Sequence, residues 1–156
     1  MDFARINPAR DAEKPATYHV EYDGEPLYTD GKPIEMDFIG MDSPAGKRAG
    51  IRHAKRIAAL QPKGKKERTI QDYSEDEIAD RAAKVTASNA KFYADMLTGW
   101  RNVTHIPSGK PGGKVELLDY TPDAALDLLS KAEWLHEGID AFLANKANWR
   151  KAGETA

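Results

Sequence analysis

Two short stretches near the start of the chain alternate between apolar and polar residues with a period of two. Residues 18–22 are rich in β-forming side chains, and in residues 34–39 apolar side chains alternate with acidic ones. Such alternation places side chains on opposite faces of a β-strand. Asp23-Gly24 and Asp30-Gly31 lie between the two stretches, and Asp-Gly is a strong signal for a tight turn. The pattern predicts a small antiparallel β-meander over residues 17–40, and no internal repeat is evident in the chain.

A helical pattern follows this region. Asp42-Ser43-Pro44 joins a capping side chain to a proline in the first turn, which is typical of a helix start. We expect this helix to continue to Leu60 and to end near Pro62, before a solvated linker that contains Lys63-Gly64-Lys65-Lys66. Its narrow apolar stripe consists of Ile51, Ala54 and Ala58, with Ile57 at its margin.

A second helix begins at a capping box, in which Ser74 is followed three residues later by Glu77. Apolar residues then recur at helical spacing as far as Thr98-Gly99, which ends the helix. The apolar residues of this helix are Ile78, Ala82, Val85, Phe92, Met96 and Leu97. Residues 100–104 and 115–118 form two further apolar stretches on either side of a glycine-rich loop. They predict a short hairpin with a flexible tip.

Two helices are expected near the end of the chain. Thr121-Pro122 begins the first, and the capping box Ser130–Glu133 begins the second. The apolar stripe of the last helix consists of Trp134, Leu135, Ile139, Phe142 and Leu143. Trp134 lies on this stripe and is expected in the core. Trp149 follows it near the end of the chain, which makes it the better candidate for an interface contact.

Together these elements predict an α+β fold that is mainly helical. It comprises a small N-terminal antiparallel β element followed by helices, with a short hairpin and a C-terminal helical pair. We expect a flexible N-terminal arm over residues 1–16 and a single globular domain over residues 17–149. That domain would contain the β element at 17–40 and a helical body at 43–149. Residues 150–156 are expected to form a disordered tail.

Composition limits the classes of protein to which the chain can belong. Hydrophobic residues make up 40% of the 156 residues and charged residues 31%, so a large apolar pocket is not expected. No cysteine is present, which excludes disulfides, thiolate catalysis and cysteine-based metal sites. The N-terminus lacks the apolar segment of a signal peptide, and no apolar run approaches the ~20 residues of a membrane span. We therefore expect a cytoplasmic protein with no membrane partner.

Known catalytic motifs are absent, so we expect neither an enzyme nor a cofactor or metal site. His19, His53, His105 and His136 lie in four different expected elements, without the spacing of metal ligands. Paired acids occur at Asp76 with Asp80 and at Asp123 with Asp127. Each pair lies in the first turns of an expected helix, where the helix dipole favours negative charge without any catalytic role.

Charge is distributed unevenly along the chain. Residues 1–46 carry four basic and ten acidic side chains, whereas residues 47–68 carry nine basic side chains and one acidic one. Such an asymmetry often marks a contact surface. Three interpretations remain open: a solvated face that neutralises the acidic region 17–42, a docking site for an acidic protein surface such as a second copy of this chain, or a nucleic-acid-binding segment. The candidate protein-interaction residues are Lys47, Arg48, Arg52, Lys55, Arg56 and Trp149.

The nucleic-acid interpretation is the weakest of the three. The basic segment 47–68 could contact phosphates, but it has no interleaved aromatic residues for base stacking. The sequence pI of about 6.1 is also far below that of a typical DNA-binding domain. We therefore do not expect nucleic acid among the partners.

The C-terminal half contains a spaced pattern of apolar and turn residues. The pattern comprises Trp100-Arg101-Asn102-Val103, residues 115–118, Tyr120-Thr121-Pro122-Asp123-Ala124, Leu128-Leu129, Trp134-Leu135, Ile139-Asp140-Ala141-Phe142-Leu143 and Ala147-Asn148-Trp149. This pattern resembles that of the tail assembly chaperones of long-tailed bacteriophages and prophages. In the N-terminal half, a strand pair leading to Phe38-Ile39-Gly40-Met41-Asp42-Ser43 before a basic helix is similar to the start of such proteins. The final aromatic residue is tryptophan where phenylalanine is usual, and the loop 107–113 is long.

This resemblance implies a protein that coats the tape measure protein, keeps that long helical chain soluble, and recruits tail tube subunits. Such chaperones act as multiple copies in the host cytoplasm and are absent from the finished virion, so a homo-oligomer is expected. The amphipathic helices 75–98 and 122–149 would shield the tape measure protein. The alternatives are a structural virion component, such as a tail-completion or head-tail connector protein, and a small nucleic-acid-binding protein that uses the basic segment 47–68.

Overall fold

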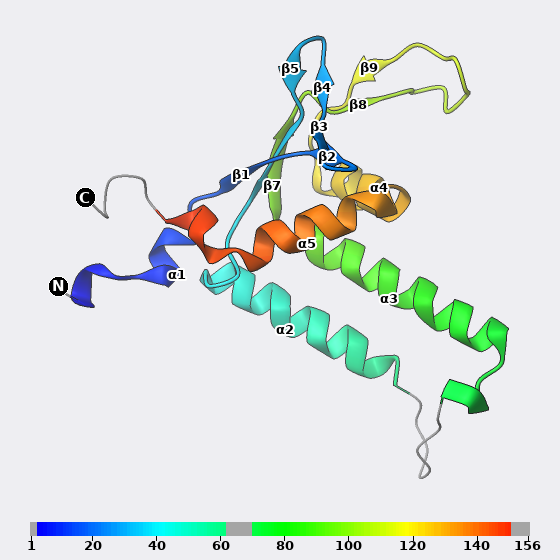
Figure 1. The fold of residues 1–156 in the computed structure, drawn as a ribbon, viewed down its shortest axis with the longest axis horizontal. Helices are drawn as coiled ribbons and strands as arrows, with labels where there is room; N and C mark the ends of the chain where they lie inside the picture. Colours follow the sequence, from blue (N-terminus) through cyan, green and yellow to red (C-terminus); the bar gives the residue numbers. More distant parts are fainter. Residues whose placement is uncertain (1–2, 62–69, 151–156) are drawn as a thin grey trace.

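The structure, a computed structural model, describes residues 3–61 and 70–150 (Figure 1). The fold is α+β and mainly helical, as the sequence predicts. The helices are η1 (Phe3–Arg5), α1 (Pro8–Asp11), α2 (Pro44–Ala59), η2 (Ile70–Asp72), α3 (Glu75–Met96), α4 (Pro122–Lys131), η3 (Glu133–Leu135), α5 (His136–Ala144) and η4 (Lys146–Trp149). The strands are β1 (Ala16–His19), β2 (Glu21–Tyr22), β3 (Glu25–Pro26), β4 (Tyr28–Thr29), β5 (Lys32–Pro33), β6 (Glu35–Phe38), β7 (Leu97–Arg101), β8 (Thr104–His105) and β9 (Glu116–Leu117). The predicted linker 63–66 and all of the predicted tail except Arg150 lie outside the described residues.

The central sheet has three antiparallel strands in the order β1-β6-β7. Strand β6 alternates as predicted, because Met36 and Phe38 are buried while Glu35 and Asp37 are partly exposed. The antiparallel arrangement predicted for residues 17–40 is correct, but a simple meander is wrong. The first strand of this region pairs with its last, and two small hairpins, β2–β3 and β4–β5, lie between them.

These two hairpins correspond to a seven-residue sequence repeat, so the expectation that the chain has no internal repeat is wrong. The repeat consists of Glu21-Tyr22-Asp23-Gly24-Glu25-Pro26-Leu27 followed by Tyr28-Thr29-Asp30-Gly31-Lys32-Pro33-Ile34. Each Asp-Gly pair has positive φ at both residues, which is the backbone of a type I′ turn. Backbone hydrogen bonds of 2.9, 2.9 and 3.0 Å join Val20, Leu27 and Ile34 into a closed ring. The repeat therefore places one apolar residue of each unit at a three-way junction on the core.

Strand β7 continues directly from helix α3, since Leu97 adopts an extended conformation at the helix end. It pairs with β6 and not with residues 115–118 as the sequence predicts; only β8 and β9 form that hairpin. Asn102 separates β7 from β8 with φ of 64°. Its amide Nδ2 donates to the carbonyl of Pro33 and its own carbonyl accepts from Thr29 Oγ1, both at 2.7 Å. These bonds attach the β4–β5 hairpin to the chain reversal at Asn102.

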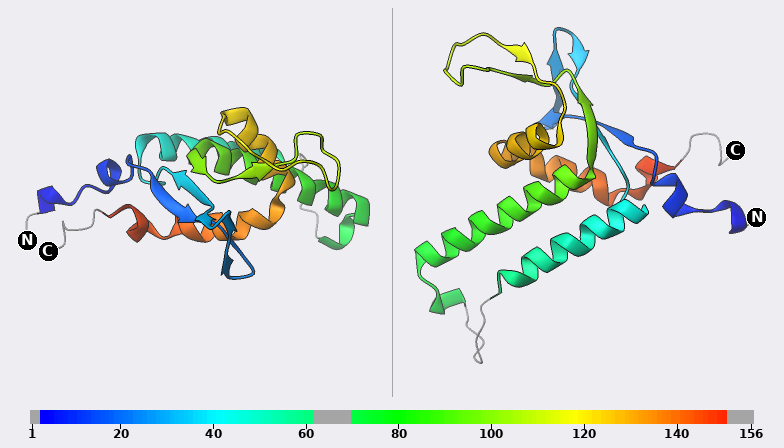
Figure 2. Two further views of the ribbon diagram at one scale, coloured as in Figure 1. Left: turned by 90° about the horizontal axis from the view of Figure 1, so that it is seen from above. Right: turned by 180° about the vertical axis from the view of Figure 1, so that it is seen from behind.

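Helices α2 and α3 lie side by side and antiparallel, and they extend away from the sheet (Figures 1 and 2). Ser43 and Ser74 cap them as predicted, with Oγ accepting from the N–H of Gly46 and Glu77. The predicted apolar stripe of α2 is wrong, because Ile51 is 56% exposed and Ala54 and Ala58 are also exposed. The face of α2 toward the core carries small residues that allow a close approach, Gly46 and Ala49.

The C-terminal helices pack on α3 and on the sheet. Thr121 caps α4 as predicted, and the core-facing residues of this region include Ala125, Leu129, Ile139 and Leu143. The predicted capping box Ser130–Glu133 is wrong, because α4 continues through Lys131. The Ser130 hydroxyl donates to the Leu126 carbonyl at 2.6 Å, a common bond for a serine within a helix.

Residues 1–16, predicted to form a flexible arm, include both exposed and packed positions: Phe3 and Ile6 are exposed, whereas the end of α1 packs against the body. Ala12 is buried, and its carbonyl accepts a hydrogen bond of 2.8 Å from the Gly40 N–H. A Cβ at Gly40 would clash with Ala12 and lie 3.1 Å from the Trp149 ring. Gly40 therefore allows α1 and η4 to approach the same turn of the chain.

The two C-terminal tryptophans exchange the roles that the sequence predicts. Trp149 is only 6% exposed, and its indole Nε1 donates to the Phe38 carbonyl at 3.0 Å, so it is a core residue and not an interface contact. Trp134 is 48% exposed and therefore does not belong to the core. Trp134 lies in the short helix η3. The apolar stripe that the sequence predicts from Trp134 to Leu143 is therefore not continuous along one helix.

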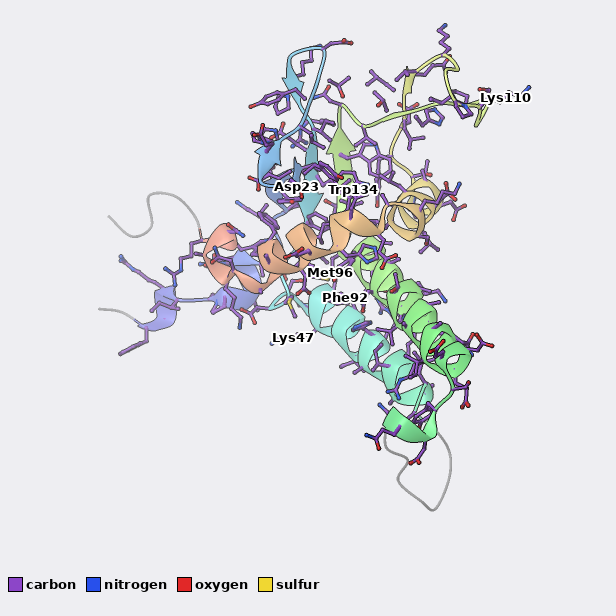
Figure 3. All side chains as sticks on the ribbon, turned by 45° about the vertical axis from the view of Figure 1, so that its right-hand side comes forward. Asp23, Lys47, Phe92, Met96, Lys110 and Trp134 are labelled. Atoms are coloured by element: carbon purple, nitrogen blue, oxygen red, sulfur yellow. The ribbon has the colours of Figure 1, made fainter. Side chains whose placement is uncertain are left out.

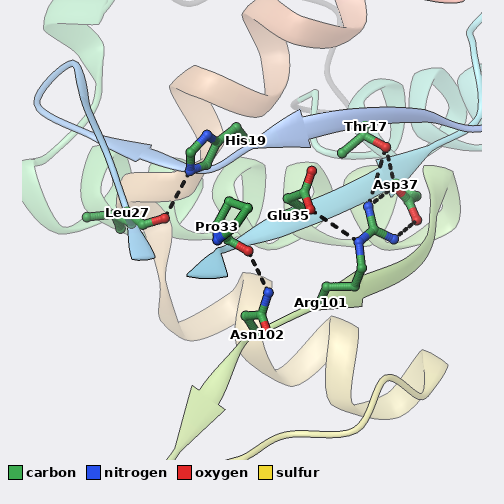
Figure 4. Close-up of polar contacts among 8 residues, drawn as sticks. All are labelled: Thr17, His19, Leu27, Pro33, Glu35, Asp37, Arg101 and Asn102. Carbon is green, nitrogen blue, oxygen red and sulfur yellow. Dashed lines mark hydrogen bonds and ion pairs between the residues drawn. The ribbon is translucent and has the colours of Figure 1, made fainter. Parts of the chain in front are cut away.

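A polar cluster on the sheet surface centres on Arg101 (Figure 4). Its guanidinium donates to both Asp37 oxygens at 2.7 and 2.9 Å, and it lies 3.3 Å from Glu35. Asp37 also accepts from Thr17 Oγ1 at 2.7 Å. The hydrogen bonds from Arg101, followed by that from Thr17, hold the pKa of Asp37 below its ordinary value.

Asp37→Asn is expected to lower the free energy of unfolding at neutral pH by about 1 kcal/mol, because the cluster is partly exposed. A carboxyl whose pKa is depressed in the folded state stabilises the protein above the unfolded pKa of about 3.9. That contribution is lost as pH falls through the folded pKa, so the variant should lose less stability on acidification than the wild type. Urea unfolding at several pH values from about 2.5 to 7 measures this difference. Equal acid dependence in Asp37→Asn, the wild type and the exposed control Asp119→Asn would contradict it.

Candidate protein-interaction surfaces

Four of the predicted interaction residues share an exposed face of α2. Lys47, Arg48, Arg52 and Lys55 are all exposed there, together with Ile51, and we call these five residues the basic face. Figure 3 labels Lys47, which lies near the start of α2. Arg52 approaches Asp95 of α3 at 3.4 Å. Within residues 3–61 and 70–150, Lys47, Arg48 and Lys55 form no ion pair. The basic face thus combines net positive charge with one large exposed apolar side chain.

Arg56, the fifth predicted basic residue of α2, does not belong to this face. It is half-buried, and its Nε and Nη2 are covered without a hydrogen-bond partner in the described part of the chain. His53 is also half-buried and stacks on Phe92 with ring centroids 4.9 Å apart. Burial, followed by the positive charge of Arg56, lowers the pKa of His53, which favours its neutral form. Arg56 therefore contributes positive charge near His53. It is not part of an exposed surface that could bind a partner.

The basic face does not neutralise the acidic N-terminal region within one copy of the chain. Arg101 pairs with Glu35 and Asp37, and Lys146 pairs with Asp42 at 3.1 Å. The ion partner that the described residues offer to α2 is Asp95 on α3. Among the described residues of the basic segment, none therefore forms an ion pair with the acidic region 17–42.

A second surface, missed in the sequence, surrounds the exposed Trp134 ring. Tyr22 of β2 lies edge-on against Trp134 with ring centroids 5.3 Å apart, and Asp23 follows in the turn (Figure 3). We call this surface the acidic aromatic patch; it consists of Glu21, Tyr22, Asp23, Glu25, Glu133, Trp134 and Glu137, all exposed. None of its carboxylates forms an ion pair within the described residues. A usable signal was present in the sequence, since Glu133 and Glu137 flank Trp134 at a four-residue spacing.

The β8–β9 hairpin carries a third exposed surface. Val115 is 60% exposed and Leu117, in β9, is 64% exposed; we call this pair the apolar hairpin face. The loop between the strands contains Gly109 and Gly112 at positive φ. Figure 1 shows the hairpin extending from the end of the molecule opposite to the α2–α3 pair. Both large apolar side chains are thus mostly uncovered by the described part of the chain.

Most of the residues considered for chemistry have structural roles. His136 is buried with Nε2 2.7 Å from the Leu129 carbonyl, and His19 Nε2 lies 3.0 Å from the Leu27 carbonyl. Asp80 and Asp127 form ordinary helical ion pairs with Lys84 and Lys131 at 2.9 and 3.0 Å. Over the described ranges, no group of three metal-ligating side chains is close enough to hold an ion.

One cavity of about 260 Å³ lies between α1, the turn after β6 and η4. Ala12, Leu143 and Trp149 contribute to its walls, and Asp42 and Lys146 at its edge pair with each other. This volume is at or below the lower limit of ~300 Å³ for small-molecule sites. None of the residues that line this cavity is a serine, threonine, cysteine or histidine.

Comparison of the chain with family models, curated proteins and solved structures finds no match. Among the described helices, none combines the length and the apolar character that crossing a membrane requires.

Proposed function

We propose that this protein is a phage tail assembly chaperone that binds the tape measure protein, keeps it soluble in the host cytoplasm and recruits tail tube subunits. The observation that carries the proposal is the apolar hairpin face. Val115 and Leu117 belong to the sequence pattern that resembles such chaperones, yet the core of this chain does not use them. A protein that shields an apolar client needs apolar side chains of this kind at its surface.

Burial explains most of the other apolar positions in that pattern. Leu129, Ile139, Leu143 and Trp149 are each at most 6% exposed. The helix faces expected to shield the tape measure protein are thus occupied by the chaperone's own core. The exposed members of the pattern, above all Val115 and Leu117, are the ones available to bind the tape measure protein. Burying one such side chain is worth about 1.5–3 kcal/mol, which gives two residues a substantial share of a binding site.

The double variant Val115→Ser/Leu117→Ser tests this assignment. We expect it to bind the tape measure protein at least about tenfold more weakly than the wild type, since tenfold corresponds to only 1.4 kcal/mol. Co-expression with the tape measure protein encoded nearby, followed by a pull-down under increasing salt, measures the difference. The matched control is Phe3→Ser/Ile6→Ser, which removes two exposed apolar side chains from the N-terminal segment, outside the hairpin.

Retention of the tape measure protein by the double variant at the wild-type level would contradict the assignment to the hairpin. Purified phage particles separate the chaperone from a structural virion component, because a chaperone should be missing from them. Retention on heparin that falls steeply with salt would instead favour the nucleic-acid alternative.

A further inference from the structure

We infer that copies of this chain associate head to tail, with the basic face of one copy docked on the acidic aromatic patch of the next. The inference extends the proposed function, because it supplies the contact by which many chaperones could line up along one tape measure protein. The occupant of each surface is thus a second copy of the same chain, recognised by opposite charge around apolar side chains.

The chemistry of the two surfaces is complementary. The basic face has Lys47, Arg48 and Lys55 around Ile51, with no ion partner among the described residues. The acidic aromatic patch has unpaired carboxylates around the Tyr22–Trp134 pair. Apolar contact between Ile51 and the Trp134 ring would be surrounded by cation–carboxylate pairs. Buried aromatic anchors within a polar rim are the usual composition of a protein interface.

The two surfaces cannot satisfy each other within one copy. The basic face lies on α2, whereas the patch is built from the β2–β3 hairpin and the η3–α5 junction. Figure 3 shows Lys47 at the start of α2, separated from Asp23 and Trp134 by the body of the fold. When identical chains associate through two different surfaces, each added copy presents a free surface for the next copy. Such association produces open chains or closed rings, and an open chain suits an elongated client.

Opposite charge reversals test the contact. One variant reverses the basic face (Arg48→Glu/Lys55→Glu), and the other reverses the patch (Glu133→Lys/Glu137→Lys). In either variant alone, the two surfaces that should meet carry charges of the same sign and repel each other. Each variant should therefore associate at least about tenfold more weakly than the wild type. An equal mixture should associate again, because each reversed surface then meets its complement on the other variant. The control Lys110→Glu/Lys114→Glu changes net charge equally on the β8–β9 hairpin and should associate like the wild type.

Sedimentation velocity of the chain alone, over a range of concentrations, is the measurement. At about 0.05 M salt the wild type should form species larger than a monomer, and these should shrink at about 0.5 M salt because screening shortens the reach of the charges. Circular dichroism checks that each variant remains folded. A monomeric wild type at low salt, or a mixture that fails to associate when both folded variants are present, would overturn the inference. Because no tape measure protein is present, that outcome leaves the client-binding experiment to be judged separately.

Discussion

Replacing Trp149 by alanine is expected to lower the free energy of unfolding by about 3–5 kcal/mol, as for other large aromatic residues removed from a core. The ring packs against Phe142 with centroids 5.2 Å apart, and its N–H reaches the Phe38 carbonyl. Removal leaves both a cavity and a buried carbonyl without its donor. The matched control is Trp134→Ala, which removes an equal side chain that is half-exposed and should cost about 1 kcal/mol or less, the usual range for surface positions.

Urea unfolding followed by circular dichroism measures both variants without relying on tryptophan fluorescence. A loss of stability in Trp134→Ala that equals or exceeds the loss in Trp149→Ala would contradict the assignment of Trp149 to the core and Trp134 to the surface. The comparison also bears on function, since Trp134→Ala should weaken self-association while leaving the fold intact.

Gly46→Ala is the second substitution with a large expected effect. Gly46 lies in the first turn of α2, and a Cβ there would clash with the Gly40 carbonyl oxygen and lie 2.9 Å from Ser43 Oγ. That hydroxyl caps the helix and also donates to the Gly40 carbonyl at 2.7 Å, so neither group can move without loss of the cap. Overpacking against backbone typically costs about 1–3 kcal/mol, and the lost cap adds about 1 kcal/mol.

Gly50→Ala in the same helix provides the opposite case. A Cβ at Gly50 meets no atom within 4 Å, so the substitution should stabilise the protein by about 0.5–1 kcal/mol through helix propensity. Thermal unfolding of the two variants side by side measures the difference in sign. A Gly46→Ala protein as stable as Gly50→Ala would mean that the turn at Gly40 does not lie against α2 as described.

Features that depend on residues close together in sequence could be predicted. Ser43, Ser74 and Thr121 each cap a helix through a hydrogen bond to a residue three positions later, so their signals are local. The alternation in β6 is likewise confirmed, since it is an intrinsic property of one strand with a buried face. The mixed, mainly helical fold class follows from these elements and is correct.

Features decided by distant contacts could not be predicted in the same way. Strand β7 pairs with β6, which lies more than 50 positions earlier in the chain. Nothing in the sequence of residues 97–101 indicates that β6 is the partner strand. Trp149 is buried because it reaches Phe38, which lies 111 residues earlier. The seven-residue repeat of the hairpins was detectable, but a unit so short is easily passed over as two isolated turn signals.

The candidate surfaces show the same difference between local features, which could be predicted, and long-range contacts, which could not. Four of the five candidate basic residues of α2 are exposed, because charged side chains seldom enter a core. Arg56 shares their charge but is half-buried, and only the packing around α2 decides that burial. The acidic aromatic patch joins two segments more than a hundred residues apart, so its components were visible in the sequence while their proximity was not.

The most direct test of the chaperone account is the fraction of tape measure protein that stays in solution when it is produced with and without this chain. The account predicts that the tape measure protein alone sediments with insoluble material. With this chain present it should remain in the supernatant and co-purify with several copies per tape measure chain. A tape measure protein that stays insoluble in both cases, with this chain free in the supernatant, would contradict the account.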